Sequence, residues 1–332
     1  MPMRSSTPPK TLIPKGVATF LPEGVRLRRS IERKIFSVFF RDGYEEVITP
    51  MFEYLDTFSK TTGEALLQSA YKFVDRSTGR IMVLRPDVTP QIARMASTLL
   101  KTRERPLRLC YSANLFRHEE EHAGHEREIF QMGGELIGHS DAQSDAEIIT
   151  LAIDMLRKLN IKSFKVVLGQ IAFTKGVLQP FASTPRLYQQ ILDSVSKKDT
   201  SRLTALLKGT RSKYKEQVLV LPNLYGGDTV LKTAASVAQA SVCQAALQRL
   251  SEVYSILTRK GFQKHLFIDL GEVRGFDYYT GTTFEIFADS VGAELGGGGR
   301  YDHLLEKFGT PSPSIGFALY IERVQQAMEA RS

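Results

Sequence analysis

The chain has no tryptophan and only two cysteines, Cys110 and Cys243, among its 332 residues. Two cysteines so far apart exclude a disulfide framework and a zinc ribbon, and they favour a reduced, cytoplasmic setting. No apolar run approaches the roughly 20 residues that span a bilayer. The first residues also lack the apolar core and small-residue cleavage site of a secretory signal. We therefore expect a chain that makes no membrane contact.

Positive charge is concentrated in two segments, although the composition as a whole is ordinary for a globular protein, with 42% hydrophobic and 24% charged residues. Of the net charge of +8, residues 1–41 carry +7 and residues 197–215 carry +6, which leaves the rest of the chain at −5. A solvated terminal arm and a solvated helical face explain these segments most simply. A contact with RNA or with an acidic protein is the alternative.

Strand-like runs follow one another through most of the chain without regular crossover helices between them. They lie at 44–54, 71–85, 107–116, 127–138, 164–169, 265–270, 276–287 and 314–320. Helices are predicted at 26–42, after Thr89-Pro90 with Thr89 as N-cap, from a capping box at Ser144 and Glu147 to about residue 159, and from Ile321. This order favours an α+β fold with an antiparallel sheet flanked by helices.

Residues 172–262 differ in character, because strand-like runs vanish there and Lys, Gln, Ala and Leu dominate, with a break at 221–228. We interpret this segment as a helical insertion. The predicted organisation is an N-terminal arm at 1–20, one domain formed by 21–171 and 263–332, and the helical insertion at 172–262.

A histidine-rich segment, His118-Glu119-Glu120-Glu121-His122, fits the metalloprotease pattern H-E-x-x-H. That chemistry needs a helix that packs one face into the protein. Residues 117–128 contain a single apolar residue, Ala123, have Gly124 in the middle, and lie between two predicted strands. We therefore predict a polar hairpin connection and no metal site.

A glycine run, Gly296 to Gly299, is followed by Arg300 and lacks the Lys-Ser/Thr of a phosphate-binding loop. Glycines allow the backbone to approach another group closely. That group is either a ligand or a neighbouring strand, and the spacing alone favours neither.

Polar residues gather at the ends of several predicted strands. They are Asp87, Thr89, Arg117, Gln131, Glu135, Arg274, Tyr278 and Tyr279. A free amino acid needs a cation for its carboxylate and an anion or hydroxyl for its ammonium, which Arg274, Asp87 and Thr89 could supply. Glu135 and Tyr279 suit an imidazole. The plainer alternatives are that Tyr278 is an ordinary strand aromatic and that the two acids pair with Arg85 and Arg127.

Several segments resemble motifs of the histidyl-tRNA synthetases. FRHEEEHAGHEREIFQMGGELIG resembles their motif 2, and VRGFDYYTGTTFE resembles their histidine-binding segment. LGGGGRYDHLLEKFG with SIGFALYIER resembles their glycine-rich strand and motif 3, and LPEGVR and LRPDVTPQIAR also fit. The resemblance implies a class II aminoacyl-tRNA synthetase-like fold that is normally dimeric.

Carried over by motif, the resemblance assigns roles to the same residues. Asp87 and Thr89 would bind the histidine ammonium, and Glu135 and Tyr279 the imidazole. The other predicted members of the histidine pocket are Arg117, Gln131, Arg274 and Tyr278. Arg117 would also lie at the α-phosphate of ATP and Arg323 at the γ-phosphate, as a vestigial ATP site.

Departures from the synthetase pattern point to a regulatory branch of the family. The sequence ends nine residues past Arg323, so we expect no anticodon-binding domain. The synthetase Glu-Gly-Thr is Asp87-Val88-Thr89 here, and the motif 2 loop carries Glu119-Glu120-Glu121 with His125 in place of an arginine. Carboxylates repel a polyphosphate, so this pattern indicates impaired ATP chemistry. The residues expected to recognise histidine are largely retained.

This combination resembles the regulatory subunits of ATP phosphoribosyltransferase. The resemblance implies a protein without catalytic residues or cofactor that binds L-histidine as effector. It also implies self-association as a dimer and a hetero-oligomer with the short-form catalytic subunit, in which it activates that subunit and confers histidine feedback inhibition; tRNA binding is not expected.

Two other functions compete with this hypothesis. A truncated histidyl-tRNA synthetase-like enzyme would form histidyl-adenylate or aminoacylate a non-standard acceptor, with help from the basic residues 197–215. An RNA-binding module would bind tRNA through the basic segments with a strong salt dependence.

Overall fold

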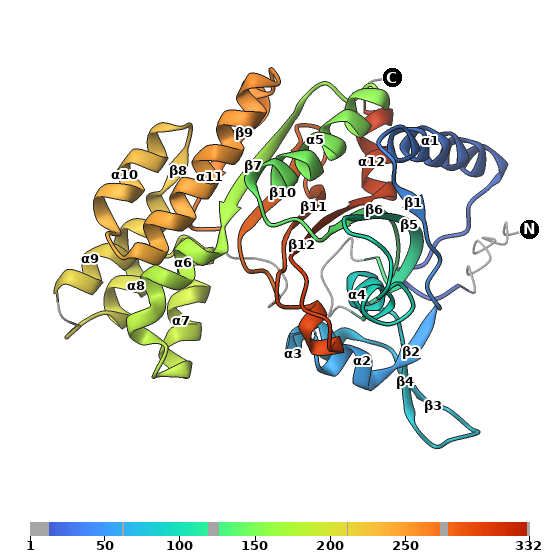
Figure 1. The fold of residues 1–332 in the computed structure, drawn as a ribbon, viewed down its shortest axis with the longest axis horizontal. Helices are drawn as coiled ribbons and strands as arrows, with labels where there is room; N and C mark the ends of the chain where they lie inside the picture. Colours follow the sequence, from blue (N-terminus) through green and yellow to red (C-terminus); the bar gives the residue numbers. More distant parts are fainter. Residues whose placement is uncertain (1–12, 62, 119–125, 211, 273–277, 331–332) are drawn as a thin grey trace, which may run out of the picture.

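The computed structural model describes residues 13–61, 63–118, 126–210, 212–272 and 278–330 (Figure 1). Within these residues, nine strands form one central sheet in the order β1-β5-β6-β12-β11-β10-β7-β9-β8. The strands are β1 (Glu45–Glu46), β5 (Leu107–Phe116), β6 (Glu128–Ile137), β7 (Phe164–Gln170), β8 (Tyr225–Gly226), β9 (Leu266–Asp269), β10 (Thr282–Ala288), β11 (Glu294–Arg300) and β12 (Ser314–Tyr320).

The sheet is mixed, so the prediction of an antiparallel sheet is correct only for its middle. The strands from β5 to β7 in the sheet order pair antiparallel with one another. At the flanks, however, β1 runs parallel to β5 and β9 runs parallel to β7. Parallel neighbours need a long crossover connection, and the helical residues 171–262 provide it between β7 and β9.

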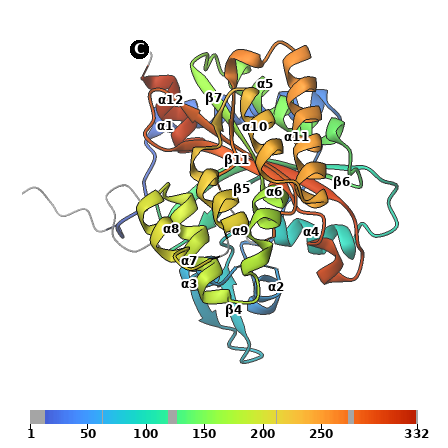
Figure 2. The ribbon, with the colours of Figure 1, turned by 90° about the vertical axis from the view of Figure 1, so that its left-hand side faces the viewer.

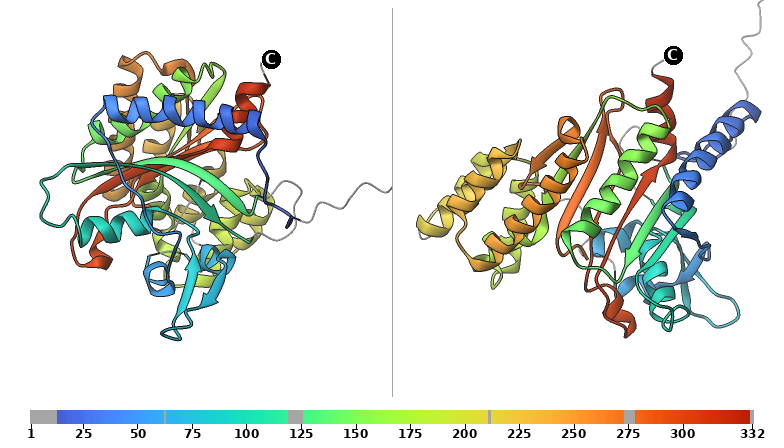
Figure 3. Two further views of the ribbon diagram at one scale, coloured as in Figure 1. Left: turned by 90° about the vertical axis from the view of Figure 1, so that its right-hand side faces the viewer. Right: turned by 45° about the horizontal axis from the view of Figure 1, so that its top comes forward.

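The sheet has two different faces. On one face lie α1 (Pro22–Arg41), α5 (Ala142–Lys158) and α12 (Ile321–Glu329), as both views of Figure 3 show. These helices share a buried cluster with Met132, Leu136 and Phe317 of the sheet. The other face packs on α4 (Thr89–Ser97) through Leu107 and Leu109. Because side chains alternate along a strand, Gln131 and Glu135 of β6 lie on this second face.

Helices dominate residues 171–262, which Figure 2 turns toward the reader. They are α6 (Ile171–Leu178), α7 (Pro185–Ser196), α8 (Thr200–Leu206), α9 (Ser212–Val220), α10 (Thr229–Val237) and α11 (Ser241–Arg259). The two-residue strand β8 lies within the predicted break at 221–228 and pairs with β9, whereas the sequence had indicated no strand there. Buried side chains such as Ile191 and Leu250 belong to the same cluster as the sheet.

A second, smaller sheet has the order β2-β4-β3 and lies at the lower right of Figure 1 with α2 (Leu55–Ser59) and α3 (Glu64–Ser69). Its strands are β2 (Phe52–Tyr54), β3 (Lys72–Val74) and β4 (Ile81–Leu84). The predicted hairpin at 71–85 is confirmed as the β3–β4 pair.

The predicted capping box of α5 is wrong. The helix begins at Ala142, and the N-cap is Asp141, whose carboxylate accepts a hydrogen bond from the Ser144 amide at 2.7 Å. Glu147 instead pairs with Arg108 of β5 at 2.9 Å. The Glu147 carboxylate, which the local pattern assigned to the helix cap, therefore forms an ion pair with a neighbouring strand instead.

The connection between β5 and β6 includes most of the histidine-rich segment. The two strands form the predicted antiparallel pair, from Leu107 opposite Ile137 to Phe116 opposite Glu128. Residues 119–125, which carry the acidic loop, His122 and His125, lie outside the described residues, and so does Arg274. The predictions for these residues stay predictions.

Candidate ligand pocket

A pocket opens on the second face of the central sheet, where α4, β5, β6, β11 and β12 meet residues 278–279. It encloses about 400 Å³ of empty space, part of it continuous with solvent. The lining residues are Asp87, Thr89, Tyr111, Arg117, Gln131, Glu135, Tyr278, Tyr279, Gly297, Tyr301, Gly316, Phe317, Ala318 and Tyr320. Seven of the predicted site residues therefore lie together, although they come from four separate parts of the sequence.

Glu135 is the most deeply enclosed acid of the pocket. Its side chain is 1% exposed, and both carboxylate oxygens are occupied. Oε1 accepts a hydrogen bond from the Thr89 hydroxyl at 2.8 Å, and Oε2 accepts one from the Tyr301 hydroxyl. Burial raises the pKa of Glu135 to about 8, although the two hydrogen bonds oppose that rise. At neutral pH the empty pocket therefore holds this group mainly in its protonated form.

Thr89 does not cap its helix as predicted. The N-cap of α4 is Val88, and the Thr89 hydroxyl instead reaches Glu135 across the pocket. The Thr89 amide donates to the Asp87 carboxylate at 3.1 Å, so Asp87 bonds the first residue of the helix. Hydroxyl and amide of one residue thus fix both buried acids.

Asp87 is the second buried acid. Its other carboxylate oxygen accepts a hydrogen bond from the Tyr278 hydroxyl at 3.1 Å. Burial raises the pKa of Asp87, and the charge of Arg117 is the largest influence in the opposite direction. Arg117 is held in place by its Nε, which donates to the Pro86 carbonyl at 2.9 Å. Two acids and one guanidinium give the pocket a mixed field that suits a ligand with both signs of charge.

Glycines make room for these side chains. A Cβ on Gly316 of β12 would overlap the Glu135 carboxylate. On the neighbouring strand β11, a Cβ on Gly297 would lie 2.5 Å from the Phe284 carbonyl oxygen, although Gly297 also lines the pocket. The glycine run therefore allows neighbouring strands to pack closely, and one of its members, Gly297, also lines the pocket. Both groups that the sequence left open, a strand and a ligand pocket, lie beside the run.

The plain alternatives for the two acids are wrong. Arg85 donates to the backbone carbonyls of Asn114 and Thr49 and not to Asp87. Glu135 is bonded by hydroxyl groups and not by Arg127. The hydrogen-bond donors to both carboxyl groups are therefore hydroxyl and amide groups.

Arg323, the predicted γ-phosphate residue, does not line the pocket. Its guanidinium pairs with the Glu294 carboxylate at 2.7 Å, donates to the Glu294 carbonyl at 2.9 Å, and lies over the Tyr320 ring at 4.4 Å from the centroid. Arg323 therefore lies outside the lining of this pocket, which includes Arg117.

Sequence reasoning missed three tyrosines of the pocket, Tyr111, Tyr301 and Tyr320. Burial raises the pKa of Tyr111 and of Tyr301 well above the ordinary value, so both hydroxyls stay protonated donors. The period-2 pattern of the strand could have pointed to Tyr111, since it shares a face with Leu107 and Leu109. Tyr301 directly follows the glycine run, a position that spacing alone did not distinguish.

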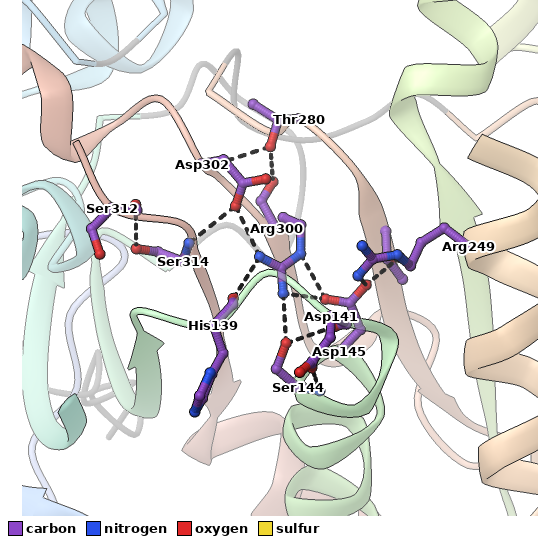
Figure 4. Close-up of polar contacts among 11 residues, drawn as sticks. His139, Asp141, Ser144, Asp145, Arg249, Thr280, Arg300, Asp302, Ser312 and Ser314 are labelled. Atoms are coloured by element: carbon purple, nitrogen blue, oxygen red, sulfur yellow. Dashed lines mark hydrogen bonds and ion pairs between the residues drawn. The ribbon is translucent and has the colours of Figure 1, made fainter. Parts of the chain in front are cut away.

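Behind the pocket, Arg300 anchors the end of β11 (Figure 4). Its guanidinium donates to the Asp145 carboxylate at 2.7 Å, to the Ser144 hydroxyl at 2.9 Å and to the His139 carbonyl at 2.9 Å. Arg249 of α11 reaches the same Asp145 carboxylate at 3.7 Å. This network fixes the backbone from which the next residue, Tyr301, extends to Glu135.

Comparison with known proteins identifies the family of this chain. A family model described as histidyl-tRNA synthetase matches residues 16–324. An ATP phosphoribosyltransferase regulatory subunit from Geobacter sulfurreducens is 38% identical over 99% of this chain and 76% of its own length. One from Moorella thermoacetica is 42% identical over 94% of this chain and 80% of its own length. The chain belongs to the ATP phosphoribosyltransferase regulatory subunit family.

Solved structures of related proteins agree with this family. A protein from Bacillus halodurans, described as an ATP phosphoribosyltransferase regulatory subunit/histidyl-tRNA synthetase, superposes with a TM-score of 0.87 at 30% identity, covering 98% of this chain and 84% of its own. An apo histidyl-tRNA synthetase from S. aureus has a TM-score of 0.64 at 24% identity and covers 96% and 70%, which shows the fold alone. The resemblance to a class II synthetase fold is thus confirmed, with a mixed central sheet.

Two further observations concern only the described part of the chain. None of its helices is both long and apolar enough to cross a membrane. No three of its His, Cys, Asp and Glu side chains gather in a way that could hold a metal ion.

Proposed function

We propose that this protein binds L-histidine in the pocket and regulates a short-form ATP phosphoribosyltransferase in histidine biosynthesis. The observation that carries the proposal is the pair of buried acids, Asp87 and Glu135, each held by hydroxyl or amide donors within a pocket that Arg117 also lines. A zwitterion with a basic ring provides partners for all three groups.

Each part of histidine finds a matching group in this proposal. The ammonium lies at Asp87 and Thr89. There its positive charge stabilises the ionised carboxylate of Asp87, as the charge of Arg117 also does. The imidazole lies between Glu135 and Tyr279 and takes up the proton that burial keeps on Glu135. Gln131, Tyr278 and Arg274 complete the pocket, with Arg274 and Arg117 as cations for the carboxylate.

Regulation requires that histidine bind two arrangements of the complex with different affinity, because a ligand that binds both equally shifts nothing. A coupling of about 1–3 kcal/mol is typical of such systems. The names of the relatives support the catalytic subunit as partner, since they are regulatory subunits of ATP phosphoribosyltransferase.

Titration calorimetry tests the binding site. The unmodified protein is expected to bind histidine, and Glu135→Gln to lose most of that affinity because a neutral amide cannot give a proton to the imidazole and become its carboxylate partner. Glu306→Gln removes an exposed carboxylate that is not among the pocket-lining residues and serves as the matched control. Equal histidine affinity in Glu135→Gln and the control would remove the basis of the proposal.

The competing function is a synthetase-like enzyme, which the place of Arg117 in the pocket favours. Adenylate formation also needs a cation at the γ-phosphate, and Arg323 is engaged by Glu294 outside the pocket. We infer that the chain does not activate histidine. Histidine-dependent exchange of pyrophosphate into ATP by the purified protein would establish the enzyme instead.

We further propose that two copies of the chain associate through the small sheet. Its pairing register places Phe52 opposite Leu84, and Tyr54 and Phe73 both opposite Met82, so that these five side chains share one face. Phe52 is 51% and Phe73 37% exposed, whereas Val83 on the opposite face is buried against Phe58. Exposed apolar surface of this kind is typical of protein contacts.

A further inference from the structure

We propose that the helical residues 171–262 are coupled to the pocket by two cations, Lys175 on α6 and Arg249 on α11, which position the pocket tyrosines Tyr279 and Tyr301. This inference rests on the proposed histidine site and names the part of the molecule that senses its occupancy. The two connections start on different helices and end on different tyrosines, so that each can be broken separately.

The first connection runs through α6. The Lys175 ammonium donates to the Tyr279 carbonyl at 3.0 Å, and the Thr174 hydroxyl donates to the Leu270 carbonyl at 2.9 Å. The Ile171 amide donates to the Gly281 carbonyl at 3.0 Å. One helix thus holds both ends of the chain between Leu270 and Gly281, which carries Tyr278 and Tyr279 into the pocket.

The second connection runs through α11, and Figure 4 shows its members. Arg249 pairs with Asp145 at 3.7 Å, and Asp145 accepts a hydrogen bond from Arg300 at 2.7 Å. Asp145 is fully buried, so its hydrogen bonds and ion pairs are strongly directional in a medium of low polarity. The next residue after Arg300 is Tyr301, whose hydroxyl bonds Glu135.

The two connections meet behind the pocket. The Thr280 amide and hydroxyl donate to the Arg300 carbonyl at 2.7 and 3.3 Å. Thr280 follows Tyr279 in the chain and Arg300 precedes Tyr301, so these hydrogen bonds join the backbone segments that carry the two tyrosines. On the side away from the pocket, α6 and α11 pack against each other. A ligand that fixes these tyrosines restrains both helices, and by linkage a partner that binds the helices changes the affinity of the pocket.

Histidine affinity provides the first test of this coupling, with five single variants of the chain. Lys175→Met and Arg249→Met remove the cations while keeping an unbranched side chain. Lys232→Met on α10 and Arg259→Met at the end of α11 are matched controls, since both residues are exposed. We expect each of the first two variants to bind histidine about tenfold more weakly than the controls, and Lys175→Arg to recover most of the loss.

Hydrogen exchange distinguishes positioning from a general loss of stability. In the unmodified protein, histidine is expected to slow amide exchange both in β6 and in α6 and α11. In the double variant Lys175→Met/Arg249→Met, β6 keeps its protection and the two helices lose theirs. Continued protection of α6 and α11 in the double variant would overturn the coupling.

The same measurement keeps the two proposals separate. If histidine protects nothing in the unmodified protein, the proposed ligand is wrong. The coupling is then tested without ligand. In Lys175→Met, the amides of residues 278–281 should exchange with solvent at least threefold faster than in Lys232→Met. Equal exchange in these two variants would contradict the coupling whatever the ligand.

Discussion

At the scale of single residues, the pocket is dominated by one carboxyl group whose charge the fold disfavours. Glu135 lies on a strand in the middle of the sheet, is 1% exposed, and accepts hydrogen bonds from two hydroxyl groups. A group kept for packing alone would cost less as glutamine or methionine. We therefore interpret the buried acid as part of a ligand site whose binding energy offsets this cost.

The pKa of Glu135 gives a stability prediction with a definite sign. Its folded pKa of about 8 lies above the ordinary value of 4.5, so the folded state holds more protons between these limits. The associated stability is complete below pH 4.5 and is lost as the pH rises through 8. Urea unfolding of unliganded protein should show Glu135→Gln gaining about 3 kcal/mol relative to the unmodified chain from pH 5.5 to 8.5. An unchanged difference over this range would contradict the assignment.

A second prediction concerns the space around the same carboxylate. Gly316→Ala places a methyl group where the Glu135 side chain lies, so strand β12 or the acid must shift. We expect a loss of about 1–3 kcal/mol in the free energy of unfolding and a histidine affinity below detection. Gly292→Ala, where an added Cβ meets nothing within 4 Å, is the control and should change neither quantity measurably.

The residues of the pocket were partly predictable from sequence, and the reason is chemical. Asp87, Gln131, Glu135 and Tyr279 were identified because a cluster of polar groups at strand ends is unusual unless the groups bind something. Tyr301 was not, because tyrosine is equally common in a sheet core, and only its hydroxyl contact with Glu135 distinguishes it. Thr89 was correctly expected to lie in the pocket, but the N-cap role also predicted for it is wrong, since a good N-cap residue and a good pocket donor look alike in sequence.

At the scale of elements, a prediction for α5 distinguishes the Asp141 N-cap from the capping box of Ser144 and Glu147. Asp141→Ala removes the acceptor of the Ser144 amide and should cost about 1 kcal/mol in urea unfolding at neutral pH. The hydrogen bond to that amide lowers the pKa of Asp141, so the difference should disappear as the pH falls below the ordinary carboxyl range. Glu147→Ala removes only a partly exposed pair with Arg108 and should cost about 0.5 kcal/mol or less. If Glu147→Ala lost more free energy of unfolding than Asp141→Ala, the predicted capping box would be supported instead.

Element types followed from the sequence more readily than their partners. Alternation and helical periodicity indicated the strands β5, β6 and β12 and the helices α1 and α12, because these patterns depend on local burial alone. The parallel pairing of β9 with β7 did not follow, since it depends on a connection of about ninety residues returning the chain to the same edge. For the same reason no local pattern indicated that α6 and α11 hold the pocket tyrosines.

At the scale of the whole molecule, self-association is expected to depend on the apolar face of the small sheet. Phe52→Glu places a charge in the centre of that face, where a second copy would bury it, and should convert the dimer to a monomer in sedimentation velocity at micromolar concentration. Leu99→Glu, at a position 77% exposed outside this sheet, is the control and should leave the dimer intact. A dimer that persists in Phe52→Glu would place the contact elsewhere.

The complex with the catalytic subunit provides the last prediction, because activation and inhibition depend on different parts of the chain. In the proposed function, activation requires assembly through the outer surface, whereas inhibition requires the pocket. Glu135→Gln should therefore still activate a short-form ATP phosphoribosyltransferase, while the histidine concentration for half-inhibition rises at least tenfold in a steady-state assay. Glu135 is only 1% exposed, so a substitution there leaves the outer surface unchanged. Loss of activation together with inhibition would instead make Glu135 a residue that the assembly itself needs, and the pocket would then not be a separate effector site.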